Sequence, residues 1–490
     1  MIDMNKNKKI IIITIISLIV LTGIYLLYNT YALTTKVTNN DGYYTIELTD
    51  SNIVSLKANE EKTVIYQINN TNNGTVSYGV AYNNSNIEVK VYSDSKDKAT
   101  GTIGANDNKY IKLHLKNKTS SNTTVEITAV MGYENGGDLI VPSDSTLVTG
   151  TYTAPISLAK YITNLYANAS KSTATNNSIT YNYATSESLM NDRLGGTTSS
   201  LDGGNIRYYG ASPNNYVYFN CDSYPSTNCE LWRIIGVFDG KIKLMRNESI
   251  GNYSWDTSAS SVNSGYGVNE WSQADLMKLL NPGHESESVG GSLYYNSKSG
   301  GTCYSGRSNA TTSCNFTSTG IKNDTTRNMI AETTYNTGGW DTSKIFSNEM
   351  YEKERSTTTV ISNPSDGITR ATTWTGKIAL AYPSDYGYAT DLSKCSQTLV
   401  NYDSSTDSYA CRSNDWMYSI ITNSGRNTGW LLTPNSSIAR YAFYVVSSGY
   451  VNSNDYVCDA YGVAPVLYLG SNQNIVAGDG SQSNPYQLKA

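Results

Sequence analysis

A long uncharged apolar run near the amino terminus limits what the rest of the chain can be. Residues 10–27 read IIIITIISLIVLTGIYLL, and three lysines within residues 1–9 precede them. A helix needs about 20 mostly apolar residues to cross a bilayer, whereas a cleavable signal peptide has an apolar region of about 7–15. Flanking basic residues stay on the cytoplasmic side. We therefore expect an uncleaved signal anchor at 10–28, a cytoplasmic stub at 1–9 and an extracellular remainder. Cleavage near the small residues at 30–32 is the alternative.

The composition argues against a nucleic-acid partner and shows an excess of tyrosine. The chain has 490 residues, a formal net charge of −5, a pI of about 5.3 and no basic stripe, so a nucleic-acid partner is not expected. Tyrosine occurs 41 times and phenylalanine 5 times. Because the codons of both residues have equal AT content, the excess favours the phenol itself. Tyrosine suits half-buried strands and rigid binding contacts.

Six of the seven cysteines form pairs that are close in sequence. Outside the membrane such pairs can oxidise, and each would close a short loop worth about 2–4 kcal/mol. The expected disulfides join Cys221 to Cys229, Cys303 to Cys314 and Cys395 to Cys411. Connectivity does not follow from sequence alone, and buried free thiols are the alternative. Cys458 is left free or intermolecular, and the lack of Cys-x-x-Cys spacing leaves a zinc site unsupported.

The first extracellular part, residues 34–153, alternates apolar and polar side chains with period two. Examples are TVIYQI at 63–68 and YIKLHL at 110–115, and turn-forming clusters such as NNTNNG separate these runs. Several short strands at this spacing predict an antiparallel β-sandwich of immunoglobulin-like size.

A short connecting region follows at residues 154–178. Its first part, PISLAKYITNLY at 155–166, has one apolar face and a proline at the first helical position, which predicts a helix. Its second part, ANASKSTATNNS at 167–178, lacks large apolar residues and is interpreted as a linker.

The remainder, residues 179–490, is rich in cysteine and tryptophan. Its clearest element is a hairpin at 231–246, with Asp239-Gly240 as the two-residue turn and an apolar, central first strand. Helices are expected at 272–280, started by a capping box of Ser272 with Asp275, and at 324–333. Further strands are expected at 377–382, 430–433, 441–446, 450–457 and 463–469.

Six phrases carry a resemblance to a known family. They are PNNYVYF at 213–219, LWRIIGVF at 231–238, AYPSDYGY at 381–388, WLLTPNS at 430–436, GVAPVLYL at 462–469 and GDGSQSNPYQL at 478–488. The chain from about residue 205 to 488 is similar to a functionally uncharacterised family of secreted or anchored proteins of Gram-positive-type bacteria. It departs from that family at Ala464, where the family usually has arginine.

The closing strands also resemble the C-type-lectin-like fold of bacterial variable proteins and formylglycine-generating enzymes. That resemblance implies an α+β domain at 179–490 in which a small rigid sheet supports long loops. It places a variable binding surface before the last strand, and such loop surfaces bind more often than they catalyse.

Few residues suited to acid–base or metal chemistry are present. His114 and His284 are the only histidines, and neither belongs to a set of nucleophile and base. Spacing cannot select a pair of carboxylates for glycoside hydrolysis from 41 acidic residues. We therefore expect no enzymatic activity, no metal site and no cofactor.

The segment YVNSNDYVCDAY at 450–461 is the predicted ligand-binding surface, because Tyr, Asn, Asp and Ser recognise many partners. The candidate residues are Tyr450, Asn452, Asn454, Tyr456 and Tyr461, with Trp430 as a platform. The alternative is the exposed face of an ordinary hairpin. The function expected is that of a membrane-anchored bacterial surface protein, attached through residues 10–28, that binds an extracellular glycan or protein. The alternatives are a structural envelope component without a specific ligand and a hydrolase of wall polymers.

Overall fold

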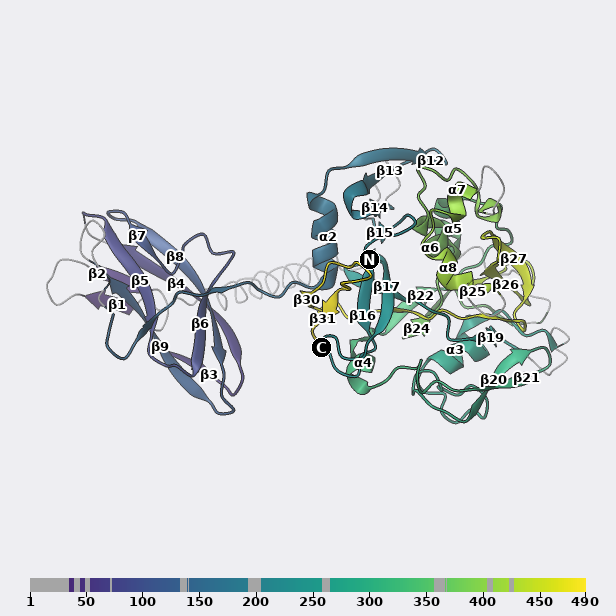
Figure 1. The fold of residues 1–490 in the computed structure, drawn as a ribbon, viewed down its shortest axis with the longest axis horizontal. Helices are drawn as coiled ribbons and strands as arrows, with labels where there is room; N and C mark the ends of the chain where they lie inside the picture. The colour runs from purple at the N-terminus through teal and green to yellow at the C-terminus, as the bar shows by residue number, and fades with distance from the viewer. Residues whose placement is uncertain are drawn as a thin grey trace, which may run out of the picture. The chain divides into compact units, whose positions relative to one another are not determined.

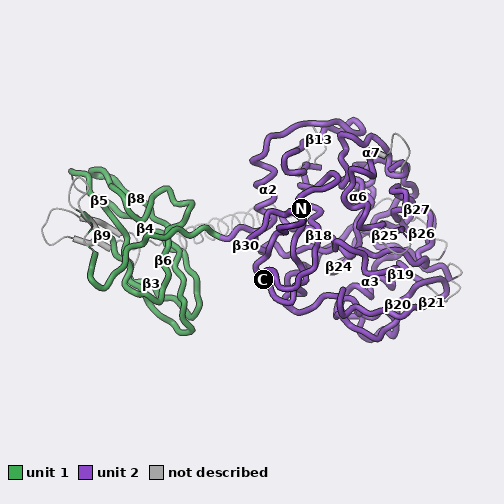
Figure 2. The backbone as a smooth tube through the Cα atoms, in the orientation of Figure 1, with its two compact units in different colours: residues 1–154 green, residues 155–490 purple. Residues whose placement is uncertain are grey.

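The computed structural model describes residues 35–38, 45–48, 53–70, 73–132, 139, 141–192, 204–257, 265–356, 366, 368–402, 409–422 and 427–490. The chain forms two compact units, Met1–Ala154 (unit 1) and Pro155–Ala490 (unit 2), shown in Figure 2. Both are built mainly from strands (Figure 1), which confirms the prediction of a mainly β chain. The predicted anchor at 10–28 lies outside the described residues. Within the described ranges, no helix is long and apolar enough to cross a bilayer.

Unit 1 is a β-sandwich, as predicted. One sheet has the order β1 (Thr35–Thr38), β2 (Thr45–Leu48), β4 (Glu61–Asn70), β8 (Asn108–Asn117), β6 (Ile87–Tyr92) and β11 (Thr151–Tyr152). The other has the order β10 (Thr146–Leu147), β5 (Val76–Tyr82), β9 (Thr123–Met131) and β3 (Ile53–Leu56), with β7 (Thr100–Ile103) beside β5. Alternation decides which side chains enter the core: Tyr66 of β4 is fully buried, and its neighbour Ile65 is 49% exposed. The inward residues of both sheets form one apolar core.

Two sheets organise unit 2. The larger has the order β12 (Ser172–Asn176), β13 (Ile179–Ala184), β14 (Leu189–Asn191), β15 (Ile206–Tyr208), β17 (Glu230–Phe238), β18 (Lys241–Arg246), β29 (Val466–Tyr468) and β24 (Ile378–Ala379), with β16 (Tyr216–Phe219) beside β17. The smaller has the order β19 (Asn252–Ser254), β28 (Ala460–Gly462), β25 (Gly429–Pro434), β26 (Tyr441–Val445) and β27 (Val451–Tyr456). One apolar core contains residues of both sheets.

Short helices and strand pairs complete unit 2. The helices are α2 (Leu158–Asn168), α3 (Asp275–Leu280), α4 (Asp324–Met329), α5 (Ser347–Glu354), α6 (Pro383–Ala389), α7 (Tyr409–Arg412) and α8 (Tyr418–Thr422). The two-stranded pairs are β20 (Gly301–Gly306) with β21 (Ala310–Cys314), β22 (Thr333–Asn336) with β23 (Thr373–Gly376), and β30 (Ile475–Ala477) with β31 (Gln487–Leu488).

The predicted hairpin at 231–246 is confirmed. Strands β17 and β18 pair on either side of Asp239 and Gly240, whose φ angles are 49° and 74°. Two consecutive positive φ angles are what a two-residue turn of type I′ requires. Strand β17 also has partners on both sides, as its two apolar faces predicted.

The predicted linker at 167–178 is wrong. Its first two residues end α2, and Ser172–Asn176 is strand β12, which pairs along its whole length with β13. The side-chain amide of Asn176 donates to the carbonyl oxygens of Leu392 and Cys395, at 3.3 and 2.6 Å. Small polar residues therefore form an integral part of unit 2, and the unit boundary falls after Ala154 rather than near residue 178.

Two predicted helix starts are also wrong. Helix α2 begins at Leu158 and not at Pro155. The hydroxyl of Ser157 caps the helix by accepting from the Lys160 amide at 3.2 Å. Before α3, the hydroxyl of Ser272 donates to Glu270 instead of capping the helix with Asp275. In both cases the hydrogen bond of a serine hydroxyl explains the start: Ser157 caps α2, whereas Ser272 is bonded to Glu270 and does not cap α3.

Four charged side chains lie buried near the middle of the larger sheet. Arg207 of β15 contacts both Asp192 and Asp385, with 3.0 Å between its Nη1 and Asp385 Oδ1, and Lys243 of β18 forms a short ion pair with Asp385. Burial alone would raise the pKa of Asp385, but the two cations together lower it below its ordinary value. Asp385 also accepts from the Tyr382 amide at 3.0 Å, which ties the start of α6 to the sheet.

Candidate functional site

The residues predicted to bind a ligand all lie on or beside the smaller sheet of unit 2, but Trp430 is not a surface platform. Trp430 belongs to β25, a central strand of that sheet whose residues are all buried and whose apolar side chains belong to the core of unit 2. Its side chain is 2% exposed, and its indole nitrogen donates to the Tyr253 carbonyl at 3.1 Å. The sequence could not distinguish an exposed tryptophan from one that completes a core.

Two tyrosines pack over Trp430 and connect it to the predicted segment. The ring centroids of Tyr461 and Tyr444 lie 4.8 and 6.1 Å from that of Trp430. The Tyr444 hydroxyl donates to the side-chain oxygen of Asn454 at 3.1 Å, and the Tyr461 hydroxyl donates to Asp455. Burial raises the pKa of both tyrosines, so both remain neutral hydrogen-bond donors.

The strand register places Tyr456 on the opposite face from Asn452. In the pairing of β26 with β27, Tyr444 lies opposite Asn452, whereas Tyr441 lies opposite Tyr456. Cross-strand partners share a face, and Tyr441 and Tyr444 point to different faces because they are three residues apart. A register shift between these pairs adds one residue to β27. The candidate residues therefore do not share one face: Asn452 and Asn454 adjoin Tyr444, and half-buried Tyr450 precedes the strand.

Tyr456 belongs instead to a second cluster, which we call the tyrosine–arginine surface. Its members are Tyr266, Arg307, Arg440, Tyr441 and Tyr456, all partly or fully exposed. The rings of Tyr266 and Tyr456 stack at 4.2 Å and 23°, and Tyr441 meets Tyr456 edge-on at 5.1 Å.

The two arginines of this surface lie against its rings. The Arg307 guanidinium is 3.8 Å from the ring centre of Tyr266 and donates to its hydroxyl at 2.6 Å. The Arg440 guanidinium lies 5.6 Å from the ring centre of Tyr456, and its Nε has no hydrogen-bond partner among the described residues. Four of the five members were missed from sequence, because they come from separate loops and strands that no local pattern connects.

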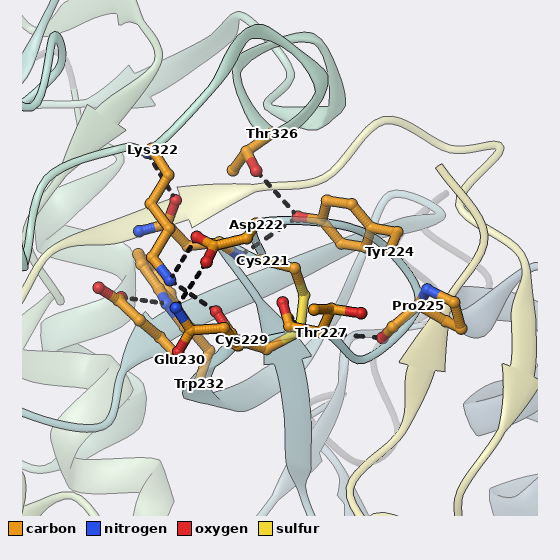
Figure 3. Close-up of a disulfide and its surroundings, with 12 residues drawn as sticks. Cys221, Asp222, Tyr224, Pro225, Thr227, Cys229, Glu230, Trp232, Lys322 and Thr326 are labelled. Carbon is orange, nitrogen blue, oxygen red and sulfur yellow. Dashed lines mark hydrogen bonds and ion pairs between the residues drawn. A yellow bond between two sulfur atoms is a disulfide. The ribbon is translucent and has the colours of Figure 1, made fainter.

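The three predicted disulfides are confirmed, and each staples a loop of unit 2. Figure 3 shows the first, Cys221–Cys229, with the hydroxyls of Tyr224 and Thr326 hydrogen-bonded at 3.2 Å and Lys322 3.1 Å from Asp222. A cavity of about 350 Å³ opens beside Asp222 and Tyr224.

Cys458 is a free thiol with little capacity to react. Its side chain is buried, and burial together with the charge of Asp459 raises its pKa to about 11. Only the thiolate is strongly nucleophilic, so Cys458 behaves as a core residue.

Groups suited to acid–base chemistry are committed to structural contacts. His114 of unit 1 contacts Glu61 at 3.2 Å and stacks on Tyr152 at 3.5 Å. In unit 2, burial raises the pKa of both Asp256 and Asp275. Each accepts backbone N–H donors, for example Asp256 from Val268 at 2.7 Å, so these carboxylates hold loops in place. In the described parts of the chain, no three His, Cys, Asp or Glu residues are grouped as metal ligands would be.

Comparison with protein families and with curated proteins finds no match to this chain. No protein-family model matches the chain. No curated protein matches it either.

Proposed function

We propose that this chain is a membrane-anchored bacterial cell-surface protein whose unit 2 binds an extracellular partner. The three disulfides support an oxidising location, because disulfides are rare in the reducing cytosol. The apolar run at 10–27, with lysines before it, supplies an anchor with the remaining chain outside. The spacing of the strands adds the finer proposal of an immunoglobulin-like unit 1, and the resemblance of the closing strands adds that of a C-type-lectin-like unit 2.

The observation that carries the binding function is the tyrosine–arginine surface. Tyrosine and arginine are enriched in protein–protein interfaces and among the residues that dominate binding energy. The three rings are already held by mutual stacking, so little side-chain entropy is lost when a partner covers them. Neither cavity described in unit 2 is lined by this surface, and a surface without a pocket suits a protein better than a small molecule.

Charge indicates which part of a partner this surface would contact. Arg307 and Arg440 both place positively charged guanidinium groups beside the rings. A carboxylate of the partner would complement these two positive charges with charge-assisted hydrogen bonds. We therefore favour an extracellular protein with an acidic side chain in its contact patch, and we treat a glycan partner as an outcome of the test.

A binding assay with single substitutions tests this function. The full chain, extracted in detergent, is applied to an array of extracellular protein domains and to a glycan array. Arg440→Gln and Tyr456→Ser should each weaken the strongest protein signal about tenfold or more. Arg412→Gln is the matched control, because it removes the same charge from an arginine that lies 5.2 Å from a different tyrosine, Tyr418.

Each outcome of this assay has one meaning. Equal loss in Arg440→Gln and Arg412→Gln would reduce the effect to net charge and reject the surface. Retention of glycans alone would replace the protein partner by a sugar. No retention on either array would favour the structural envelope component. In a separate assay, degradation of a cell-wall preparation by the chain would favour the hydrolase.

The proposed location has its own test. External protease added to intact cells should digest the chain, because residues after the anchor are expected outside. Protection on intact cells, with digestion only after lysis, would reject both the orientation and the extracellular partner.

A further inference from the structure

The three disulfides of unit 2 differ in their exposure to solvent. All four cysteines of the Cys303–Cys314 and Cys395–Cys411 bridges are at most 5% exposed and belong to the apolar core. Cys221 is fully buried as well, but it lies outside that core, and its partner Cys229 is partly exposed. All six bridged cysteines lie within the described ranges, so Cys229 is the one bridged cysteine that a molecule in solution can contact without opening the fold.

The partly exposed bridge closes a surface loop at residues 221–229, which Figure 3 shows. This loop connects β16 to β17, two paired strands of the larger sheet. Six of the seven residues between the two cysteines are exposed, and the seventh, Tyr224, is half-buried. A small reagent therefore meets this bridge on the surface, whereas it meets the other two only after part of the core has opened.

Backbone pairing holds the two cysteines together even without their S–S bond. Phe219 of β16 pairs with Glu230 of β17, so the strand pair ends directly beside the bridge. Inside the loop, the Asp222 amide donates to the Thr227 carbonyl at 3.1 Å, and the Thr227 amide donates to the Ser223 carbonyl at 2.9 Å. Reduction of this bridge would leave two thiols close together, and closing so short a loop again costs little entropy.

Side chains fasten the same loop from outside. The Lys322 ammonium donates to the Asn228 carbonyl at 2.6 Å and lies 3.1 Å from one carboxylate oxygen of Asp222. The side-chain amide of Asn228 donates to the other oxygen of Asp222 at 2.6 Å. These contacts join both halves of the loop to each other and to Lys322, so the bridge can open and form again on a folded chain.

We propose that the Cys221–Cys229 bridge is a site of reversible modification by small extracellular thiols, with Cys229 as the residue attacked. The thiolate of the small molecule forms an S–S bond to Cys229 Sγ while the bond between Cys229 and Cys221 breaks. Cys221 Sγ keeps the electron pair of the broken bond and takes up a proton from water. The product carries the small molecule on Cys229 as a mixed disulfide.

Two further steps are open to that product. Attack of the Cys221 thiolate on Cys229 Sγ restores the bridge and releases the small thiol. Attack of a second small thiol on the bound one leaves both cysteines as thiols, and the two small molecules depart joined as a disulfide. This reactivity goes beyond the proposed binding function and does not depend on the tyrosine–arginine surface.

Thiol exchange on the native chain tests the site. The full chain in detergent is incubated with reduced glutathione at about pH 8, where part of a free thiol is ionised. Samples are denatured in excess iodoacetamide, digested without reductant and mapped by mass spectrometry. Glutathione on Cys229, with Cys221 alkylated, should appear at least about tenfold faster than products of the other two bridges, which react only from rarely populated open states. Tryptophan fluorescence recorded during the reaction should stay that of folded unit 2, which contains all seven tryptophans.

Two matched variants test which cysteine is attacked. Cys221→Ser leaves the partly exposed thiol, Cys229→Ser leaves the buried one, and both lose the same S–S bond. Treated with oxidised glutathione, folded Cys221→Ser should gain one glutathione at Cys229, and folded Cys229→Ser should gain none at Cys221. The rate comparison uses the unaltered chain, so it decides the question even if a variant fails to fold.

Four results would overturn the proposal. They are similar rates at all three bridges, a first adduct on any cysteine other than Cys229, equal modification of the two folded variants, and reaction with a protein dithiol such as thioredoxin but not with glutathione.

Discussion

Replacing Asp385 by asparagine tests whether the buried charges of unit 2 stabilise it as a balanced set. Arg207 and Lys243 supply two positive charges, Asp192 and Asp385 supply two negative ones, and all four side chains are at most 5% exposed. Asparagine keeps the shape of aspartate and an oxygen that can still accept from the Tyr382 amide. It removes one negative charge, so two buried cations face a single carboxylate.

The expected loss follows from that imbalance. Removal of one partner of a buried ion pair lowers the free energy of unfolding by about 3–5 kcal/mol, because the remaining charge stays out of water without compensation. Lys243→Met in the same chain restores the balance, since Arg207 still pairs with Asp192. The double variant should therefore be more stable than the sum of the single effects predicts, by at least about 1–2 kcal/mol.

Urea unfolding followed by tryptophan fluorescence measures these effects in unit 2 alone, because all seven tryptophans lie after residue 154. The wild type, both single variants and the double variant complete the cycle. A loss below about 1 kcal/mol for Asp385→Asn, or strictly additive effects, would refute the view that these charges are coupled.

Three further changes probe burial, cross-linking and backbone contact. Burial raises the pKa of Glu354 to about 7, against the opposing effect of Arg355, so the folded state holds this proton more tightly than the unfolded state and stability falls as pH rises from about 4.5 through 7. The free energy of unfolding of Glu354→Gln, relative to that of the wild type, should therefore rise by roughly 3 kcal/mol between pH 5 and pH 8. A difference between the two proteins that does not change with pH would contradict this. Replacing Cys395 and Cys411 by serine opens a loop of sequence separation 16 and should lower the free energy of unfolding by about 3 kcal/mol relative to the oxidised wild type. Under reducing conditions, which open all three disulfides in the wild type, the variant and the wild type should be equally stable. Gly236→Ala would place a Cβ 2.2 Å from the Ile206 carbonyl oxygen, so it should destabilise unit 2 by about 1–3 kcal/mol in the same urea assay; a neutral effect would mean that β15 can move aside.

Sequence patterns predicted those parts of the fold that depend on residues close together in the chain. Alternation located the strands of unit 1, and Asp239-Gly240 located the hairpin, because the side-chain period and the turn conformation depend on neighbours in sequence. The predicted linker was wrong because the contacts of this segment are made with residues distant in the chain. The partners of Asn176 are carbonyls 216 and 219 positions further along the chain, and no pattern around residue 176 reports them.

The predicted site was wrong in two ways: Trp430 is buried, and the register of β27 is shifted by one residue. Regular alternation would place Asn452, Asn454 and Tyr456 on one face, but the extra residue in β27 moves Tyr456 to the other. Spacing in the sequence does not reveal such a shift. The disulfides were predicted because the close sequence separation of the cysteines also keeps them close in space.

The excess of tyrosine over phenylalanine has a physical explanation in unit 2. Many buried tyrosines use their hydroxyls to satisfy carbonyl groups of irregular loops: Tyr382 donates to the Asn336 carbonyl at 2.8 Å and Tyr386 to the Gly449 carbonyl at 2.7 Å. Phenylalanine would fill the same volume and leave those carbonyls unpaired.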